Sequence, residues 1–569
     1  MKWTIAEEPD PHIVRHLEQV LHIPHKIARL LARRGIETYE QARKFFSPTW
    51  DDIYDPFLMK DMDKAVQRIR QAIYRKEKIL IYGDYDVDGT TAVALLYSFL
   101  KERYPHLEFY IPDRNKEGYG ISFRGVEYAV ANGFSLMIAL DCGIKAVEQI
   151  RYAKEHGLDV IIGDHHTPGD VLPPAYAILN PKQKDDTYPY KELSGAGIAF
   201  KIVQALNQTE GRTIDKIIPY LDLLAVSIAA DIVPITDENR SLMYFGLQQL
   251  NISPRPGLRV LMRSMKKQEW TVSDLVFVLA PRINSAGRME HGKLAVKLLI
   301  ETNERKAEEL GRLIENNNRE RRETDQTMTE EALQKIEKHI NPDNYTTVVY
   351  DETWHKGVVG IVASRLIERY YRPTIVMTYS EKDNLWVGSA RSIKNFDLYA
   401  VLDAIDEHIH QFGGHKFAAG LSVRPEKLDD FVAAFENKVR EVLPGGLPEP
   451  EIFIDDELDL IDITPKFYRL LKRFAPFGPG NMKPIFMTRD LRDTGFARRV
   501  GKDQNHLKMN LIDGTTRAEY SAIAFGFGDY LPRIKTADSF AAAYHIEENE
   551  WNNTVSLQLN VKDIRFDLD

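Results

Sequence analysis

One short segment, Lys78-Ile-Leu-Ile-Tyr-Gly-Asp84-Tyr-Asp86-Val-Asp88-Gly89, constrains this chain most, because three aspartates directly follow an apolar run. The run predicts a short buried strand that ends at the first glycine. If the backbone stays extended, alternate side chains share a side, so Asp84, Asp86 and Asp88 would lie together. Three carboxylates this close repel one another unless a cation lies between them. The segment therefore predicts a metal site at a strand end, with a solvated acidic turn as the alternative.

The region around this segment, about residues 61–302, alternates between apolar runs and helical patterns. The candidate strands are Lys78–Gly83, Glu108–Pro112, Leu136–Leu140, Val160–Gly163 and Tyr176–Leu179, with helical stretches such as Thr90–Arg103 and Gly125–Asn132 between them. This alternation predicts an α/β domain with a parallel sheet. In such sheets, ligands bind beyond the carboxyl ends of the strands.

Two further predicted strands end directly in possible metal ligands. Asp141 follows Leu136–Leu140, and the triplet Asp164, His165, His166 follows Val160–Gly163. A single His-His pair is a weak signal, but acidic or imidazole groups at three strand ends of one sheet rarely arise by chance. The repetition therefore strengthens the prediction of a metal site.

A helical apolar segment that begins at Leu221 ends at Asp231. A carboxylate there opposes the helix dipole unless a cation or cap compensates, which marks Asp231 as a further candidate ligand. Carboxylates with one or two imidazoles suit Mn²⁺ better than zinc. The acids are too many for one small ion, so the pattern predicts two metals that clamp a phosphoryl group and activate a water.

The remaining segments divide the chain of 569 residues into further units. Residues 1–60 have helical patterns, and residues 303–344 predict a long connecting helix in which Asn316-Asn-Asn318 allows a break. Residues 345–445 form a second α/β stretch. Residues 446–569 have short alternating runs that favour a small β-barrel.

Composition excludes several classes of protein. No apolar run has the length of a membrane span, and the N-terminus lacks the pattern of a signal peptide. The one cysteine, Cys142, excludes an internal disulfide and a cysteine-based zinc site, and favours a reducing cytoplasm. The net charge of −9 argues against a surface coated in phosphate-binding charge, but it leaves room for a local basic channel.

The second α/β stretch carries two turns of small residues. In Trp386-Val-Gly-Ser389-Ala-Arg391, short side chains let backbone amides approach a phosphate while the guanidinium grips its oxygens. Gly413-Gly-His415-Lys416 has the same character. Phosphate contact is the preferred interpretation, and tight turns in a packed domain are the alternative.

Longer motifs resemble the DHH phosphoesterase superfamily and, within it, the RecJ family of bacterial 5′→3′ exonucleases specific for single strands. They are Tyr82-Gly-Asp-Tyr-Asp-Val-Asp-Gly89, Glu117-Gly-Tyr-Gly120, Ala229-Ala-Asp-Ile-Val-Pro234, Pro281-Arg-Ile-Asn-Ser-Ala-Gly-Arg288 and Gly413-Gly-His-Lys-Phe-Ala-Ala-Gly420. The resemblance implies a parallel-sheet DHH domain, a long helix, a smaller α/β DHHA1 domain and a C-terminal OB-like β-barrel. It also implies two divalent ions, Mn²⁺ or Mg²⁺, and single-stranded DNA as substrate.

The resemblance assigns a role to each candidate site residue. Asp86 and Asp141 would hold one metal with Asp84 beside them; Asp88, Asp141, His165 and Asp231 would hold the other; His166 would lie near the scissile phosphate, and Asp164 would orient the histidines. Ser389 and Arg391 would bind a 5′-terminal phosphate, with Arg114, Arg282 and Arg288 as candidate contacts to DNA phosphates. His415, predicted as a phosphate contact from its own segment, completes the set. A single-strand-binding protein and a repair helicase are the implied partners, in DNA repair and recombination.

Two other functions remain open at this level. A phosphodiesterase acting on short oligonucleotides or cyclic dinucleotides would use the same two α/β domains, although the barrel-like tail argues against so small a substrate. A non-catalytic scaffold for nucleic acid is the other, and the filled ligand positions argue against it.

Overall fold

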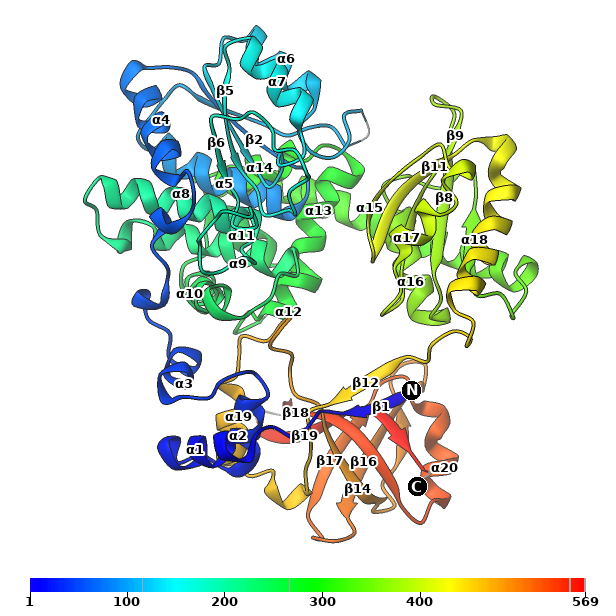
Figure 1. Ribbon diagram of the computed structural model, residues 1–569. Coiled ribbons are helices and arrows are strands. Elements are labelled where there is room, and N and C mark those ends of the chain that lie inside the picture. The colour runs from blue at the N-terminus through cyan, green and yellow to red at the C-terminus, as the bar shows by residue number, and fades with distance from the viewer. Residues whose placement is uncertain (115, 266, 552–553, 567–569) are drawn as a thin grey trace.

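The computed structural model describes residues 1–114, 116–265, 267–551 and 554–566, which form three lobes (Figure 1). The first lobe contains a five-stranded parallel sheet in the order β3-β2-β4-β5-β6. Its strands are β2 (Ile79–Gly83), β3 (Leu107–Tyr110), β4 (Leu136–Leu140), β5 (Asp159–Gly163) and β6 (Ala177–Leu179). All five strands lie where the sequence predicts them, to within a few residues at each end.

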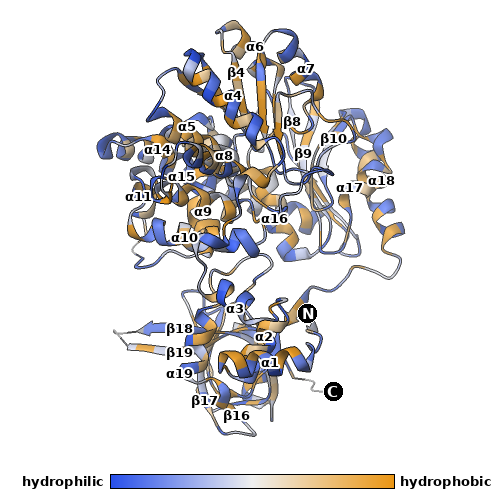
Figure 2. Cartoon of the chain, turned by 60° about the vertical axis from the view of Figure 1, so that its left-hand side comes forward, coloured by the Kyte–Doolittle hydropathy of each residue, from blue (hydrophilic) through white to orange (hydrophobic). Residues whose placement is uncertain are grey.

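Helices cover both faces of this sheet, as its uniformly apolar central strands require. Ile79, Ile81 and Ile138 face the core shared with α5, α8 and α9, whereas Leu80 and Met137 face α6 and α7. The helices of the lobe are α4 (Met62–Arg75), α5 (Val87–Lys101), α6 (Phe123–Ala131), α7 (Val147–Glu155), α8 (Gly195–Thr209), α9 (Leu221–Ala230), α10 (Asp237–Ile252), α11 (Pro256–Met262), α12 (Val272–Asp274), α13 (Ala280–Met289) and α14 (Lys293–Ile300). Figure 2 shows the apolar colouring along β4 and through α8 and α9.

A single helix, α15 (Glu304–His339), connects the first two lobes. The predicted break at Asn316–Asn318 is wrong, because the helix runs through these residues without interruption. Ala307 and Ile314 pack into the core of the first lobe, and Met328 and Ala332 pack beside the second. Packing along both halves outweighs the weak helix propensity of asparagine.

The second lobe is a mixed sheet in the order β10-β11-β9-β8-β7, with helices packed against it. Its elements are β7 (Thr347–Tyr350), α16 (Val359–Tyr370), β8 (Thr374–Ser380), β9 (Leu385–Arg391), α17 (Leu398–Asp403), β10 (Gln411–His415), β11 (Ala418–Val423) and α18 (Leu428–Val442). The two small-residue turns identified in the sequence therefore lie in strands, with Gly420 of β11 paired to Ser389 of β9.

The third lobe is a seven-stranded sheet in the order β13-β14-β18-β19-β17-β16-β15, in which β14 also pairs with β16. This extra pairing brings five of its strands into a ring. The elements are β12 (Glu451–Ile454), β13 (Asp456–Glu457), α19 (Pro465–Lys472), β14 (Phe486–Asp493), β15 (Arg498–Val500), β16 (His506–Asp513), β17 (Glu519–Ala524), α20 (Leu531–Thr536), β18 (Phe540–Trp551) and β19 (Thr554–Arg565).

The N-terminal residues belong to the third lobe in space. The sequence pattern does not predict β1 (Lys2–Ile5), which pairs in parallel with β12. The helices α1 (Pro11–Leu21), α2 (His25–Ala32) and α3 (Tyr39–Phe46) share a core with α19 and the seven-stranded sheet, and Figure 1 shows the blue N-terminal helices beside the orange strands. Within the part of the chain that the structure describes, no helix has the length and hydropathy to cross a membrane.

Candidate metal centre and adjoining cavity

The three aspartates after β2 do not lie on an extended strand, so that part of the sequence prediction is wrong. The chain turns at once into α5, with Asp86 as its N-cap accepting a hydrogen bond from the Gly89 amide at 3.0 Å. Asp84 is fully buried, and one of its oxygens has no hydrogen-bond partner in the described parts of the chain. Asp88, in the first turn of α5, accepts from the amides of Gly195 and Ala196 at 2.6 and 2.8 Å. The acids converge because a helix begins there.

Asp141 lies at the end of β4 in a strained backbone conformation, with a φ of 59°. It is 1% exposed, and among the described residues neither carboxylate oxygen has a hydrogen-bond partner. The start of α8 presses against it, since a Cβ on Gly195 would lie 2.5 Å from the Asp141 Cβ. Strain together with a bare buried carboxylate is expected at a functional site, where another group satisfies the oxygens.

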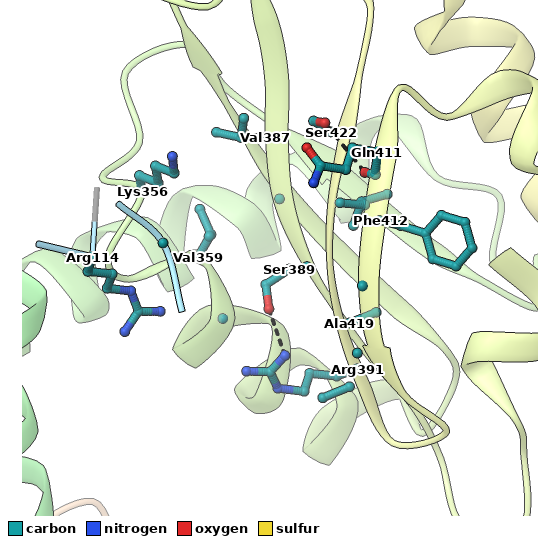
Figure 3. A pocket seen from close by; sticks show the side chains of 18 of the residues that line it. Arg114, Lys356, Val359, Val387, Ser389, Arg391, Gln411, Phe412, Ala419 and Ser422 are labelled. Carbon is teal, nitrogen blue, oxygen red and sulfur yellow. Dashed lines mark hydrogen bonds between the residues drawn. The ribbon is translucent and has the colours of Figure 1, made fainter. Parts of the chain in front are cut away.

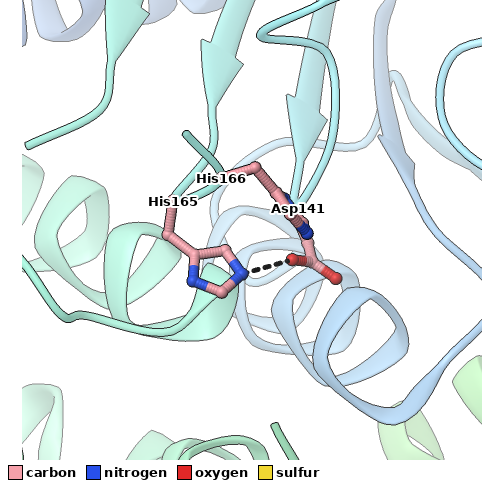
Figure 4. A group of neighbouring side chains, drawn as sticks. All are labelled: Asp141, His165 and His166. Atoms are coloured by element: carbon pink, nitrogen blue, oxygen red, sulfur yellow. Dashed lines mark ion pairs between the residues drawn. The ribbon is translucent and has the colours of Figure 1, made fainter. Parts of the chain in front are cut away.

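The triplet after β5 divides into a supporting acid and two imidazoles. Asp164 accepts from the Ile144 amide at 2.9 Å and lies 2.7 Å from Nδ1 of His166. His165 is buried, and its Nε2 lies 3.2 Å from an Asp141 oxygen and 3.6 Å from an Asp231 oxygen (Figure 4 shows the Asp141 contact). Neither ring nitrogen of His165 has a hydrogen-bond partner within the part of the chain that the structure describes.

Asp231 is the C-cap of α9, as the sequence predicts, and it joins the same cluster. Ligand atoms of Asp88, His165 and Asp231 lie within 4.8 Å of one another, and so do those of Asp141, His165 and His166. The structure therefore brings together residues from the ends of β2, β4, β5 and α9.

The charges of the buried acids in this cluster favour the binding of a cation. Burial raises the pKa of Asp141, and the nearby Asp88 and Asp86 raise it further. Burial and the same two neighbours raise the pKa of Asp231 to about 9. Burial lowers the pKa of His165, which favours the neutral imidazole that metals bind. Bare carboxylate oxygens, a neutral imidazole and mutual repulsion fit divalent cations.

His166 differs from His165 in its surroundings. Burial lowers the pKa of His166, but the hydrogen bond to Asp164 and the charges of Asp164, Asp88 and Asp86 together raise it overall. Its Nε2 lies 3.0 Å from the hydroxyl of Tyr119. The half-exposed ring of His166 is therefore held as a hydrogen-bond donor at the edge of the cluster.

Sequence reasoning missed three supporting groups. Tyr119 lies inside the motif Glu117–Gly120 but was not identified as a site residue; its hydroxyl contacts His166 and, at 3.4 Å, the Asp141 carbonyl. The amides at the start of α8 and the hydroxyl of Ser227, 2.6 Å from Asp88, hold that carboxylate. A glycine-rich helix start, Ser194-Gly-Ala-Gly197, was the available signal for the amides.

A cavity of about 590 Å³ lies between the first and second lobes, beside the cluster. Tyr85, which lines it, stands between Asp84 and Asp86 in the chain. The cavity is also lined by Arg114 and Arg288 from the first lobe and by Lys356, Ser389, Arg391, Gly413 and Gly414 from the second. Figure 3 labels Arg114, Lys356, Ser389 and Arg391 among these residues. No acidic side chain is among the described residues of its lining.

The arginines of this cavity are crowded and poorly solvated. Arg391 donates to Ser389 Oγ at 2.6 Å, and burial followed by the charge of Arg114 lowers its pKa. Burial, with Arg114, Arg321 and Arg391 nearby, lowers the pKa of Arg288 to about 9. Convergent guanidinium groups without acidic partners are suited to an anion such as a phosphate.

Two predicted contacts lie outside the cavity lining. Arg282 is bound by Glu315 at 2.7 Å and donates to the Val278 carbonyl. His415, at the end of β10, is exposed, and burial followed by the charges of Arg391 and His166 lowers its pKa.

The chain matches three known domain families along its length. These are the DHH family, N-terminal domain, over residues 78–228, the DHHA1 domain over residues 343–441 and the RecJ OB domain over residues 454–563. The three families correspond to the three lobes.

Comparisons over the whole chain give the same result as the domain families. The chain is 39% identical over 574 residues to the single-stranded-DNA-specific exonuclease RecJ of Bacillus subtilis, covering 99% of this chain and 70% of that one. The crystal structure of RecJ with Mn²⁺ from Thermus thermophilus has a TM-score of 0.85 at 26% identity, covering 99% of this chain and 79% of that one. The structure of that RecJ with Mg²⁺ has a TM-score of 0.80 at 25% identity, covering 99% and 78%. The chain belongs to the RecJ family of single-stranded-DNA-specific exonucleases.

Proposed function

We propose that the chain is a metal-dependent exonuclease that degrades single-stranded DNA in the 5′→3′ direction to 5′-mononucleotides. The observation that carries this proposal is the adjacency of two sites, the cluster of bare carboxylates and the arginine-lined cavity, which share the segment Asp84–Asp86. The names of the relatives support single-stranded DNA as the substrate. The Mn²⁺ and Mg²⁺ structures of the Thermus protein support either ion as cofactor.

Two divalent ions would be held by the acids at the strand ends. Asp86 and Asp141, with Asp84 beside them, would hold one; Asp88, Asp141, His165 and Asp231 would hold the other, so that Asp141 bridges. When bound, a metal pair lowers the pKa of a water and stabilises charge on a phosphoryl group. Asp88 is oriented for this role by two amides and a hydroxyl, and Asp164 orients the imidazole of His166.

His166 would donate a hydrogen bond to the scissile phosphate. Its raised pKa keeps the donor available, and Tyr119 holds the exposed side of the ring. Because the group acts on an oxygen of the substrate, its place at the rim of the cluster suits the role better than that of His165, which is buried among the carboxylates.

The cavity would determine which end of the strand is cleaved. Ser389, Arg391, Arg114 and Arg288 would bind the 5′-terminal phosphate, and Arg282 and His415 would contact the strand outside this pocket. An anion site at a set distance from the metals admits a chain end and measures the length removed. A volume of about 590 Å³ lies within the range of roughly 300–1,000 Å³ of ligand pockets.

The third lobe would hold the strand beyond the scissile bond. OB folds bind single strands by base stacking and positive charge, and the match to the RecJ OB domain supports that role. A dinucleotide needs no such surface, which disfavours a phosphodiesterase of small substrates. We also propose action in the cytoplasm in DNA repair and recombination, with a single-strand-binding protein and a repair helicase as partners.

The test is digestion of end-labelled single-stranded DNA, with and without a 5′ phosphate, in Mn²⁺. We expect mononucleotides to be released from the 5′ end, faster when that end is phosphorylated. A matched duplex with blunt ends is the control and should resist. Release from the 3′ end, or equal digestion of the duplex, would contradict the proposal.

A further inference from the structure

Arg240 has an unusual environment for a buried charge. It lies in α10, is 5% exposed and, among the described residues, pairs with no carboxylate. Burial, with Arg34 nearby, lowers its pKa to about 9. Burying a guanidinium without an acidic partner costs free energy of folding. We therefore expect Arg240 to have a role that an apolar side chain of the same volume could not perform.

All the described hydrogen bonds of the Arg240 guanidinium go to main-chain carbonyls of another lobe. Its guanidinium donates to Phe45 at 2.9 Å, Phe474 at 2.9 Å, Ala475 at 3.0 Å and Pro476 at 3.2 Å. It also stacks on the Phe45 ring, 3.6 Å from the centroid. One side chain of the first lobe thus holds two separate segments of the third lobe, the end of α3 and the turn after α19.

The adjacent loop makes the same connection through its backbone. The Ile235 amide donates to the Pro479 carbonyl at 2.7 Å. A Cβ on Gly478 would lie 2.4 Å from the Ile235 side chain, and a Cβ on Gly480 would lie 2.7 Å from Thr236. Asn481 braces the turn by donating to the Phe474 carbonyl at 2.8 Å, and it accepts from Arg34. We call Arg240, Ile235 and the turn 473–481 the interlobe joint.

The joint lies next to the metal cluster in the chain. Asp231 ends α9, and only five residues separate it from the start of α10. The Pro234 carbonyl between them is fixed by the Tyr190 hydroxyl at 3.1 Å and by Asn239 at 3.0 Å. The segment that supplies a metal ligand therefore also carries the attachment of the third lobe.

Lobes joined by ordinary contacts move relative to one another unless their interface is large and apolar. A planar fork of donors that meets carbonyls of two segments removes that freedom, because a change of orientation breaks several bonds together. We propose that Arg240 is a positioning residue, which locks the OB lobe at a set orientation to the metal centre so that long strands bind without a cost of ordering the lobes. This inference rests on the proposed function.

The first experiment does not depend on activity. Spin labels on Gln208→Cys and Lys535→Cys, both exposed and in different lobes, report the distance between the lobes; the native Cys142 is buried. We expect a narrow distribution in the otherwise native chain and a broad one with Arg240→Met or Arg240→Lys. The lysine variant keeps the charge and serves if the methionine variant fails to fold.

Arg372→Met is the matched control. Arg372 is equally buried and also donates to carbonyls, those of Asn344 and Pro342, but inside the second lobe. Its loss should destabilise the protein without widening the distribution. An unchanged distribution in both Arg240 variants would overturn the inference.

The second experiment compares kcat/KM on a long single strand with that on a dinucleotide. Arg240→Lys should lower the ratio of kcat/KM on the long strand to that on the dinucleotide by about tenfold. The loss should appear as a higher KM on the long strand, because the mobile lobes must be ordered each time a long strand binds. Simple loss of folded protein lowers both values alike and leaves the ratio unchanged. A broad distribution with an unchanged ratio would overturn the positioning role. A native chain that digests neither substrate would instead contradict the proposed function.

Discussion

At the scale of single residues, the metal cluster stands out because several of its buried polar atoms make no hydrogen bond within the described chain. Among the described residues, neither buried oxygen of Asp141 and neither ring nitrogen of His165 has a hydrogen-bond partner. A fold does not retain such groups for its own stability, because each buried unsatisfied polar atom costs about 1–3 kcal/mol. The cost is expected where a cation supplies the missing interactions.

Asp141→Asn should separate activity from stability. Because the variant loses the carboxylate that we propose bridges the two metals, we expect hydrolysis to fall by about a thousandfold, corresponding to several kcal/mol of metal stabilisation, while DNA binding largely survives. In the presence of a chelator, the variant should unfold at a higher temperature than the native chain, because one charge is removed from a cluster of repelling carboxylates. Mn²⁺ should raise the Tm of the variant less than it raises the Tm of the native chain. Asp170→Asn, at an exposed position, is the control. Retained hydrolysis would contradict the bridging role.

Ile232, next to Asp231, is a second residue that lowers the stability of the fold. It has a φ of 59°, a conformation that a β-branched side chain disfavours, and it is 63% exposed. Ile232→Gly should therefore stabilise the protein by about 1 kcal/mol, because it relieves the strain and loses little burial. Ile232→Ala keeps a Cβ and should gain less. The check is thermal unfolding in chelator, and destabilisation by the glycine would show that the side chain packs against something essential.

At the scale of elements, α15 shows why local sequence signals mislead. Three consecutive asparagines lower helix propensity by a total of about 2 kcal/mol relative to alanine. The helix continues because it contributes to two cores, through Ala307 and Ile314 on one side and Met328 and Ala332 on the other. The aspartates after β2 give the opposite case, since the helix start that gathers them replaces the extended backbone that periodicity alone implies.

Strand β18 contains a histidine that makes stability depend on pH. Burial lowers the pKa of His545 to about 4, and its Nδ1 lies 2.8 Å from the Pro484 carbonyl. An unfolded chain takes up this proton near pH 6.5, which the folded chain does not, so stability falls as pH drops from about 6.5 to 4, by about 2–3 kcal/mol.

Urea unfolding across that pH range tests this expectation. His545→Gln should flatten the profile below pH 6.5, whereas His16→Gln, at an exposed position of α1, should leave it as it is. An unaltered slope in the His545 variant would mean that other groups cause the acid sensitivity.

At the scale of the whole molecule, the cavity exists only because two lobes face each other. Arg114 and Arg288 come from one side, and Ser389 and Arg391 from the other. Among the described residues, no single domain contains this set of donors, so the site depends on how α15 places the first and second lobes.

Arg391→Ala should reduce the preference for a 5′-phosphorylated end by about tenfold or more, because a charge-assisted hydrogen bond contributes about 1.5–3 kcal/mol. The measurement is the ratio of kcat/KM for matched strands with a 5′ phosphate and a 5′ hydroxyl. Arg424→Ala, at an exposed position of the same lobe, should leave the ratio unchanged. An unchanged ratio in the Arg391 variant would place the terminal phosphate elsewhere.

The sequence by itself determined the parallel sheet, its five strands and the acids and imidazoles at their ends, because strand periodicity and the end of an apolar run are local properties. Only the tertiary structure decided that α15 is unbroken, that the N-terminal helices pack on the third lobe, and that Tyr119, the α8 amides and Ser227 support the cluster. These features depend on contacts between residues far apart in the chain. The energies of such contacts exceed local propensities and leave no periodic trace in the sequence.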